Sequence, residues 1–255
     1  MEEPSTITPI LPAETPGSKT ETRHIHRFVI FLIVGMVALV LAPDYVRAGI
    51  WRQIVAHKVL TAFFVFFLVL ALSVIWQLGS KLDDLVFLFL NVKGSRTKLS
   101  DTLMEVFTQI GNGVFAVLLA GAFYLSGQRT FAFQFVLGTF TLWLTVEAIK
   151  LLIGRKRPFY VLTTARIVGN KAMGYSFPSG HTSQAFYLAT ILSQNFELPW
   201  YGVLGLYLLA VLTGITRIYL GAHYPKDVIA GAFLGTVWGY FAGVLYGLVQ
   251  TWVGW

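Results

Sequence analysis

The sequence has no cysteine and very little charge for its length. Only 12% of its 255 residues are Asp, Glu, Lys or Arg, against about 25% in a typical soluble domain, whereas 56% are apolar. The missing thiols exclude disulfides, zinc–thiolate sites, iron–sulfur clusters and cysteine nucleophiles. The apolar composition predicts a chain that lies in a lipid bilayer, and its length leaves no room for a second large soluble domain.

The first 27 residues differ from the rest of the chain. They hold four prolines, several Ser and Thr residues and charges of both signs, without apolar periodicity. Such a segment cannot bury enough surface to offset its ordering entropy, so we predict a disordered tail over residues 1–27. It lacks the basic start, short apolar run and small-residue cleavage site of a secretory signal peptide, and we expect no cleavage.

Apolar runs follow one another along the remaining sequence. Most reach the roughly 20 residues that span a bilayer once their uncharged flanks are included. The runs are Phe28–Ala42, Val59–Leu78, Gly113–Leu125, Phe131–Ile153, Thr182–Leu192, Tyr201–Ile215 and Val228–Val253. We predict an all-α polytopic membrane helix bundle with six core transmembrane helices and an extra N-terminal one. Residues 28–58 are then the extra segment with its loop, and residues 59–255 are the functional core.

Two segments are ambiguous. The run Phe28–Ala42 is short and is closed by Pro43. It could span fully, re-enter or lie along the surface, and a full span is the preferred interpretation. The segment Asp83–Asn91 is too short to cross a bilayer and predicts an interfacial helix.

A first polar cluster lies where the run Phe131–Ile153 reaches the surface. Lys150, Arg155, Lys156 and Arg157 fall within eight residues. They could anchor the helix at the lipid headgroups. Lys150, however, lies about one helical turn inside the run, where an anion in a cavity would be its natural partner. Glu147 could pair with it on the same helix face, and we prefer this structural role for Glu147 over catalysis.

A second cluster precedes the run Thr182–Leu192. Ser179 is a natural helix N-cap, and Gly180 lets a phosphate approach the backbone closely. The free amides and the positive end of the helix dipole favour an anion there. His181, in the first turn, would reach the leaving oxygen of such a phosphate, or it could serve only as a cap or interface residue.

A third cluster lies between the last two runs. Pro225 fits the first turn of a new helix, which puts Asp227 near His223 at the i, i+4 distance. A carboxylate that accepts the proton of one imidazole nitrogen leaves the other nitrogen as a nucleophile. Arg217 adds a planar fork suited to phosphate oxygens. A purely structural Asp–His hydrogen bond is the alternative.

The predicted topology brings these clusters together. Suppose that the helices from residue 131 onward alternate in direction. One face of the bundle then carries the end of the run Phe131–Ile153, the start of the run Thr182–Leu192 and the turn after the run Tyr201–Ile215. Three polar sets that each suit phosphate then share one site. We therefore expect a phosphate-binding site at the mouth of a helix bundle.

The spacing of these residues resembles that of a known family. The motifs are Lys150-x6-Arg157-Pro158, Pro178-Ser179-Gly180-His181 and Arg217-x5-His223-x3-Asp227. Together they resemble the three-part signature of the type 2 phosphatidic acid phosphatase superfamily, which includes membrane lipid phosphatases and soluble vanadium haloperoxidases. The position before Arg217, often Ser in the family, is Thr216 here, which retains the hydroxyl.

The resemblance implies a role for each motif residue. His223 would attack phosphorus and form a phosphohistidine, Asp227 would orient His223, and His181 would protonate the leaving oxygen and later activate water. The phosphoryl oxygens would be held by Lys150, Arg157, Ser179, Gly180 and Arg217. We expect no metal or other cofactor, because no Asp or Glu cluster that could bind magnesium lies beside the motifs.

The expected partner is a membrane lipid phosphate whose tail stays in the bilayer. We prefer undecaprenyl diphosphate or phosphatidylglycerol phosphate to phosphatidic acid and lipid A. A lipid phosphotransferase or a lipid A phosphatase with the same site is the alternative, and an anion transporter is the alternative outside enzymes. No nucleic-acid partner is expected, and the oligomeric state is left open.

The orientation in the membrane rests on two conflicting signals. Most loop cations lie on the presumed active-site face, so the positive-inside rule places that face in the cytoplasm. The resemblance places it on the extracytoplasmic face of the cell (inner) membrane. We favour the resemblance, because several of these cations have a phosphate-binding reason to be there and the basic loop after Leu78 is long.

Overall fold

The computed structural model describes residues 19–93 and 97–253, and all regular secondary structure in these ranges is helical. The elements in chain order are α1 (Lys19–Leu41), α2 (Asp44–Ala56), α3 (Lys58–Ile75), α4 (Ser80–Asn91), α5 (Lys98–Thr108), the 3-10 helix η1 (Gln109–Gly111), α6 (Gly113–Leu125), α7 (Arg129–Ile153), α8 (Pro158–Val161), α9 (Gly180–Asn195), α10 (Trp200–Tyr219) and α11 (Pro225–Val253).

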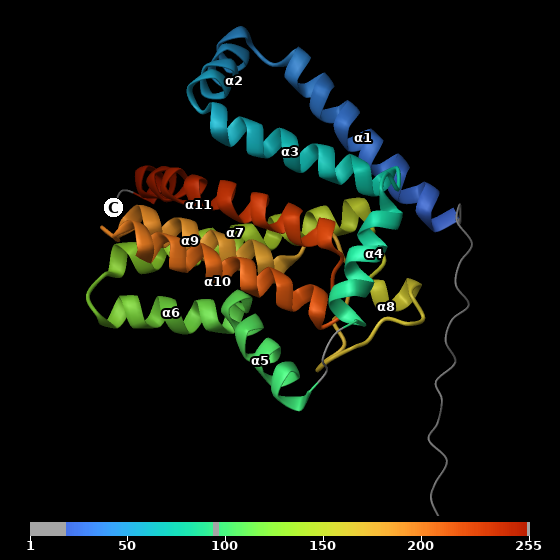
Figure 1. Cartoon of the computed structure of the whole chain (residues 1–255). Coiled ribbons are helices and arrows are strands. Elements are labelled where there is room, and N and C mark those ends of the chain that lie inside the picture. Colours follow the sequence, from blue (N-terminus) through green and yellow to red (C-terminus); the bar gives the residue numbers. More distant parts are fainter. Residues whose placement is uncertain (1–18, 94–96, 254–255) are drawn as a thin grey trace, which may run out of the picture.

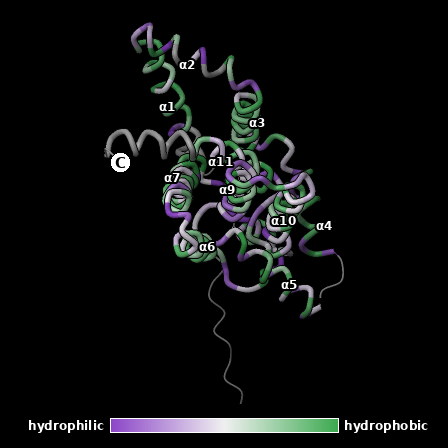
Figure 2. The backbone as a smooth tube through the Cα atoms, turned by 90° about the vertical axis from the view of Figure 1, so that its left-hand side faces the viewer, coloured by the Kyte–Doolittle hydropathy of each residue, from purple (hydrophilic) through white to green (hydrophobic). Residues whose placement is uncertain are grey.

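Helix α9 lies at the centre of the bundle. In Figure 1 the helices α3, α11, α9, α10, α7 and α6 run roughly side by side, and Figure 2 looks nearly along them, with α9 in the middle. It contacts α11, α10, α7 and η1. Residues 182–185 and 187–191 of this helix are buried. Polar groups there need partners from neighbouring helices, as when Gln184 Nε2 donates to Thr139 Oγ1 on α7 at 3.1 Å.

Helix α11 approaches α9 closely along a row of glycines. Gly231, Gly235 and Gly239 are spaced four residues apart and so share one helix face. A Cβ atom on Gly231 would lie 2.7 Å from the Ser179 carbonyl oxygen, and one on Gly239 would lie 2.5 Å from Thr190 Cβ. Small residues allow this approach of two backbones inside a membrane bundle. It also places the start of α11 beside the start of α9.

The bundle has the composition of a multi-pass membrane protein. Three stretches are long and apolar enough to cross a bilayer, namely Lys58–Ile75, Arg129–Val161 and Trp200–Tyr219. The consecutive helical segments Lys98–Gly111 and Gly113–Leu125, which meet at a bend of 57°, would make a fourth span. The apolar side chains of α3 are largely exposed on the bundle surface, as a lipid-facing helix requires. The central α9, with 16 residues, is shorter than these spans.

Most predicted apolar runs correspond to helices, with a few differences. Helix α6 has the predicted bounds, α7 ends at the predicted Ile153, and the predicted short helix is α4. Helix α1 begins at Lys19, so residues 19–27 of the expected tail are helical, and residues 1–18 lie outside the described ranges. Helices α2 and α5 are additional, because both mix charged and apolar residues and form no continuous apolar run.

The segment between α7 and α9, which includes α8, lies at one end of the bundle (right in Figure 1). Asn91, at the end of α4, donates to the carbonyl oxygens of Arg166 at 2.9 Å and Tyr219 at 2.8 Å, and its Oδ1 accepts from Arg166 N at 2.7 Å. Arg166 also pairs with Asp101 on α5 at 2.5 Å. These contacts fasten the segment between α8 and α9 to α4, α5 and α10.

Candidate active site

The three sequence motifs meet at this end of the bundle. Arg157 lies between α7 and α8, Ser179 precedes α9, and His223 lies in the turn between α10 and α11. Arg157 Nη1 lies 3.2 Å from His223 Nε2, and Ser179 N donates to the Asp227 carbonyl oxygen at 3.0 Å. The predicted convergence of the motifs on one face is therefore confirmed.

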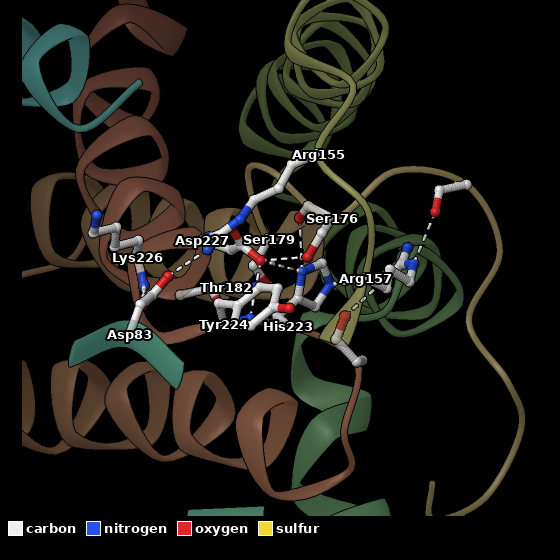
Figure 3. Close-up of polar contacts among 12 residues, drawn as sticks. Asp83, Arg155, Arg157, Ser176, Ser179, Thr182, His223, Tyr224, Lys226 and Asp227 are labelled. Carbon is white, nitrogen blue, oxygen red and sulfur yellow. Dashed lines mark hydrogen bonds and ion pairs between the residues drawn. The ribbon is translucent and has the colours of Figure 1, made fainter. Parts of the chain in front are cut away.

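His223 presents an unprotonated nitrogen to the site. Its Nδ1 lies 2.7 Å from the Ser176 carbonyl oxygen, and because a carbonyl can only accept, Nδ1 carries the proton. Nε2 is then free of a proton and accepts from Arg157 Nη1. We expected Asp227 to accept the Nδ1 proton, but its Oδ2 lies 3.6 Å away. That oxygen instead accepts from Ser176 Oγ and from Tyr224 N (Figure 3). A backbone carbonyl therefore sets the tautomer.

Burial sets the protonation of the site residues. It lowers the pKa of His223 to about 3, although the negative charge of Asp227 works in the opposite direction. Burial also lowers the pKa of His181 to about 2, and the charge of Arg217 contributes to this shift. Burial opposes ionisation of Asp227, but the Arg155 charge holds the pKa of that carboxyl below its usual range. At neutral pH the site therefore contains two neutral imidazoles and an ionised carboxylate.

Arg157 is buried beside His223 Nε2. Its Nε donates to Gly174 O at 3.0 Å, its Nη1 to Ala222 O at 2.9 Å and its Nη2 to Met173 O at 2.6 Å. Carbonyl oxygens orient a guanidinium but carry no full negative charge. The positive charge of Arg157 therefore remains available next to His223.

Arg217, near the end of α10, is also buried and has no carboxylate partner among the described residues. Its Nη1 donates to Thr108 Oγ1, the last residue of α5, at 2.9 Å. Its Nε is buried and has no hydrogen-bond partner among the described residues. An unsatisfied buried donor on a cation favours an anionic ligand at this position.

Two cavities meet at His181. The first, the Arg217 cavity, has a volume of about 500 Å³. Its polar and charged lining residues include Glu105, Thr108, Gln109, Lys171, His181 and Arg217. The second, the Lys150 cavity, has a volume of about 520 Å³ and lies among α6, α7 and α9. Its lining includes Phe135, Leu142, Trp143, Val146, Glu147, Lys150, Gly180 and His181. His181 thus separates a charged compartment from one that is mostly apolar.

Two further sequence predictions are confirmed. Lys150 Nζ lies 2.7 Å from Glu147 Oε1, so these residues form the predicted pair on α7. Ser179 Oγ accepts from Thr182 N at 3.4 Å and from Thr182 Oγ1 at 2.9 Å, so Ser179 caps α9 as predicted.

Sequence reasoning missed several contributors to the site. Ser176 holds both His223 and Asp227, and Asp83 on α4 reaches the same network through Arg155. Arg155 appeared in the sequence only as one cation of a possible headgroup anchor. Asp83 lies in a segment that predicts an interfacial helix, and its polarity next to an apolar run is the one signal that could have drawn attention to it.

The charged groups of the site suit an oxyanion better than a metal ion. Both carboxylates nearest His223 are engaged by Arg155, and Glu147 is engaged by Lys150. Among the side chains that the structure describes, no group of three His, Asp or Glu residues is placed to hold a metal. The guanidinium groups of Arg157 and Arg217 have no carboxylate partner among the residues that the structure describes.

Comparisons with known proteins agree with this chemistry. The family model of the PAP2 superfamily matches residues 131–251. A lipid A 4'-phosphatase from Bacteroides thetaiotaomicron is 30% identical over 63% of this chain and 75% of its own length. An undecaprenyl-diphosphatase from Sulfolobus acidocaldarius is 36% identical over 35% of this chain and 43% of its own length.

A solved structure shares the fold. The crystal structure of a transmembrane PAP2-type phosphatidylglycerolphosphate phosphatase from Bacillus subtilis covers 74% of this chain and 96% of its own, with a TM-score of 0.62 and 23% identity. Residues 131–251, which the family model matches, contain all three motifs. The chain therefore belongs to the PAP2 superfamily and is a membrane lipid phosphate phosphatase.

Proposed function

We propose that this protein removes phosphate from a membrane lipid phosphate or diphosphate through a phosphohistidine on His223. One observation carries the proposal: two buried guanidinium groups, Arg157 and Arg217, have no carboxylate partner in the described part of the chain. An uncompensated buried charge is strongly unfavourable. A phosphate dianion bound beside His223 and His181 would compensate both charges.

In the first step, His223 Nε2 attacks phosphorus, and a phosphorus–nitrogen bond forms as the bond to the lipid oxygen breaks. Arg157 and Arg217, with Lys150, Ser179 and the Gly180 amide, stabilise the charge on the phosphoryl oxygens. His181 gives a proton to the departing oxygen. Burial and the positive charges around His181 keep it neutral, and it gains this proton once the substrate dianion offsets those charges.

In the second step, water replaces the imidazole. His181, now neutral, takes a proton from a water molecule that attacks phosphorus, and the phosphorus–nitrogen bond breaks to release inorganic phosphate. Asp227 keeps Ser176 in place throughout, so the Nδ1 proton of His223 stays on the side away from phosphorus. As phosphate leaves, His181 returns the proton taken from water to the solvent, so each turnover restores the starting protonation of the site.

The two cavities support a substrate with a polar end and an apolar end. The Lys150 cavity offers Phe135, Leu142, Trp143 and Val146 to a lipid tail between α6 and α7. The Arg217 cavity has room for phosphate and additional polar groups. We propose that residues 59–255 form the phosphatase core with six spans and that residues 28–58 contain an extra N-terminal span. We also propose that the site opens on the extracytoplasmic face of the cell membrane.

Undecaprenyl diphosphate and phosphatidylglycerol phosphate are the substrates we favour, and lipid A is the second candidate. The relatives named above support all three, since they include enzymes for each. The test is phosphate release by the purified protein in detergent from a panel of these lipids and phosphatidic acid. Release from none of them would refute the proposed substrate class.

The role of His223 has a matched test. The His223→Ala protein should lose phosphate release while it keeps the thermal unfolding midpoint of the wild type. His57, which precedes α3 and is exposed, provides the control, because His57→Ala should leave activity unchanged. Full activity of the His223→Ala protein would exclude the phosphohistidine.

Orthovanadate and EDTA test the chemistry of the transition state. Vanadate adopts the trigonal bipyramid that phosphorus passes through, so it should inhibit competitively, whereas EDTA should have no effect. Loss of activity in EDTA would instead require a metal.

Two other functions predict different products. A lipid phosphotransferase would pass labelled phosphate to a second lipid instead of to water. An anion transporter would move phosphate into sealed vesicles without hydrolysis. Release of labelled inorganic phosphate from the lipid panel separates the proposed hydrolase from both.

A further inference from the structure

Arg155 forms ion pairs with two buried carboxylates, those of Asp83 and Asp227. Gly154, in the left-handed conformation, ends α7 and turns the chain so that Arg155 points toward α11. Its Nη1 donates to Asp227 Oδ1 at 2.6 Å, and its Nη2 donates to Asp83 Oδ2. Figure 3 shows the guanidinium between the two carboxylates. The two carboxylates are essentially inaccessible, and the Arg155 side chain is 15% exposed.

We infer that Arg155, itself held by Asp83 on α4, is a positioning residue for the nucleophile His223. This inference rests on the proposed function, because it assigns a role within the same reaction. Arg155 occupies one of the six unspecified positions of the motif Lys150-x6-Arg157-Pro158, so it is not one of the residues that define the family's signature. It also lines neither the Arg217 cavity nor the Lys150 cavity, so it acts on the substrate only through other residues.

The connection from Arg155 to His223 runs through Ser176 at two points. The Arg155 side chain orients Asp227, whose Oδ2 accepts from Ser176 Oγ. The Arg155 carbonyl oxygen accepts from Ser176 N at 2.8 Å. Ser176 is therefore held through both its hydroxyl and its backbone N–H, which fixes the position of its carbonyl oxygen. That oxygen binds the Nδ1 proton of His223 and so selects the tautomer with a reactive Nε2.

Asp83 fixes the other end of Arg155. Its Oδ1 accepts from Lys226 N at 2.9 Å, and its Oδ2 accepts from Arg155. The guanidinium also lies over the Tyr224 ring at 4.0 Å. A planar fork is the side chain that can donate to two carboxylates at once, whereas a lysine ammonium acts as a single point charge. Helix α4 is in this way coupled to a nucleophile that it does not touch.

A comparison of Arg155→Lys with Lys156→Ala tests the inference. Lys156 is the neighbouring cation of the same basic segment and is exposed, so its removal reports any general effect of positive charge at the headgroups. For Arg155→Lys, kcat on dioctanoyl phosphatidic acid should fall on the order of 100-fold, as expected when a nucleophile loses its alignment. The KM should stay within about twofold, because the phosphate-binding groups remain. Lys156→Ala should leave both constants unchanged.

Asp83→Asn provides a second variant, with a milder perturbation that keeps the Arg155–Asp227 pair. It should lower kcat less than Arg155→Lys does, again with KM unchanged. The double variant should be no slower than Arg155→Lys alone, since Asp83 acts through Arg155. If Arg155→Lys fails to fold, Asp83→Asn alone decides the matter through its kcat.

The outcomes that overturn the inference are distinct from failure of the proposed function. Wild-type kcat in both Arg155→Lys and Asp83→Asn would show that the network has no role in positioning. A raised KM with unchanged kcat would make Arg155 a substrate-binding cation. Failure of the wild-type protein to release phosphate from any lipid would refute the proposed function. In that case nitrogen NMR of the His223 imidazole still tests the positioning role. Arg155→Lys should release His223 from its bond to Ser176, and the NMR spectrum reports the resulting change of tautomer.

Discussion

Replacement of Gly231 by alanine should disturb both the fold and the catalytic step. A Cβ atom at this position would lie 2.7 Å from the Ser179 carbonyl oxygen, 3.1 Å from Thr182 Cβ and 3.3 Å from Ser183 N. Ordinary contacts begin at 3.4 Å, so the start of α9 must retreat by about 0.7 Å (3.4 − 2.7). These neighbours belong to one helix backbone or to its first turn, so no flexible side chain can absorb the displacement.

The size of the effect follows from two opposing terms. Overpacking of a tight interface costs about 1–3 kcal/mol. Alanine in place of glycine within a helix stabilises the folded state by about 0.5–1 kcal/mol. The net loss is about 0–2.5 kcal/mol of unfolding free energy, with a midpoint of about 1 kcal/mol. A shift of 0.7 Å at Ser179 also misaligns the groups around the phosphate, and since a displacement of about 1 Å costs roughly 100-fold, we expect kcat to fall about 10-fold or more.

The assay compares three alanine variants by thermal unfolding in detergent and by phosphate release. Gly205→Ala on α10 is the matched control, because a Cβ atom there meets nothing within 4 Å, and it should be as stable as the wild type or slightly more so. Gly235→Ala disturbs the same pair of helices one turn further from the site, so it should lose stability with a smaller loss of kcat. Equal stability and activity of Gly231→Ala and Gly205→Ala would refute the argument from close packing.

Three further predictions concern the site. Because the pKa of His223 falls from 6.5 unfolded to about 3 folded, the unfolded state binds more protons below pH 6.5. Stability should therefore decrease by on the order of 1 kcal/mol for this residue between pH 7.5 and 5.5. The lowered pKa of His181 should decrease stability over the same pH range. A pH-independent unfolding midpoint would contradict the lowered pKa values of both histidines. Thr108→Val leaves Arg217 Nη1 without its acceptor and should reduce unfolding free energy by about 1–3 kcal/mol, whereas Thr108→Ser should restore it. Gly111→Ala should lower kcat, because its Cβ atom would overlap the His181 backbone, and a normal kcat would show that η1 does not position His181.

The sequence predicted those parts of the fold that depend on local patterns. The bounds of α6 and the end of α7 follow from runs of apolar residues, and the cap of α9 follows from the hydrogen-bonding capacity of Ser179. The convergence of the three motifs follows from alternating helix directions. Each of these inferences needs only the chemistry of a short segment or the connectivity of the chain.

The remaining features depend on contacts that local patterns do not encode. The contact of Asp83 with Arg155 joins residues 72 positions apart, and nothing near either residue specifies the other. The acceptor for the His223 Nδ1 proton is a backbone carbonyl, which every residue carries, so the sequence pointed to the carboxylate of Asp227 instead. Helix α5 is amphipathic and short, and nothing in its sequence indicates that Thr108 accepts a hydrogen bond from Arg217.

The hydrogen bond between Arg157 and His223 occupies the lone pair that the proposed reaction uses. Arg157 Nη1 donates to Nε2, the nitrogen that attacks phosphorus in the proposed mechanism. A phosphoryl oxygen carries more negative charge than a neutral imidazole nitrogen and is the stronger acceptor for a guanidinium. A bound phosphate therefore draws this donor away from Nε2 and exposes the lone pair at the moment when phosphorus lies next to it. The same bond disfavours protonation of Nε2 in the absence of substrate, because the proton and the guanidinium would compete for one lone pair beside a second positive charge.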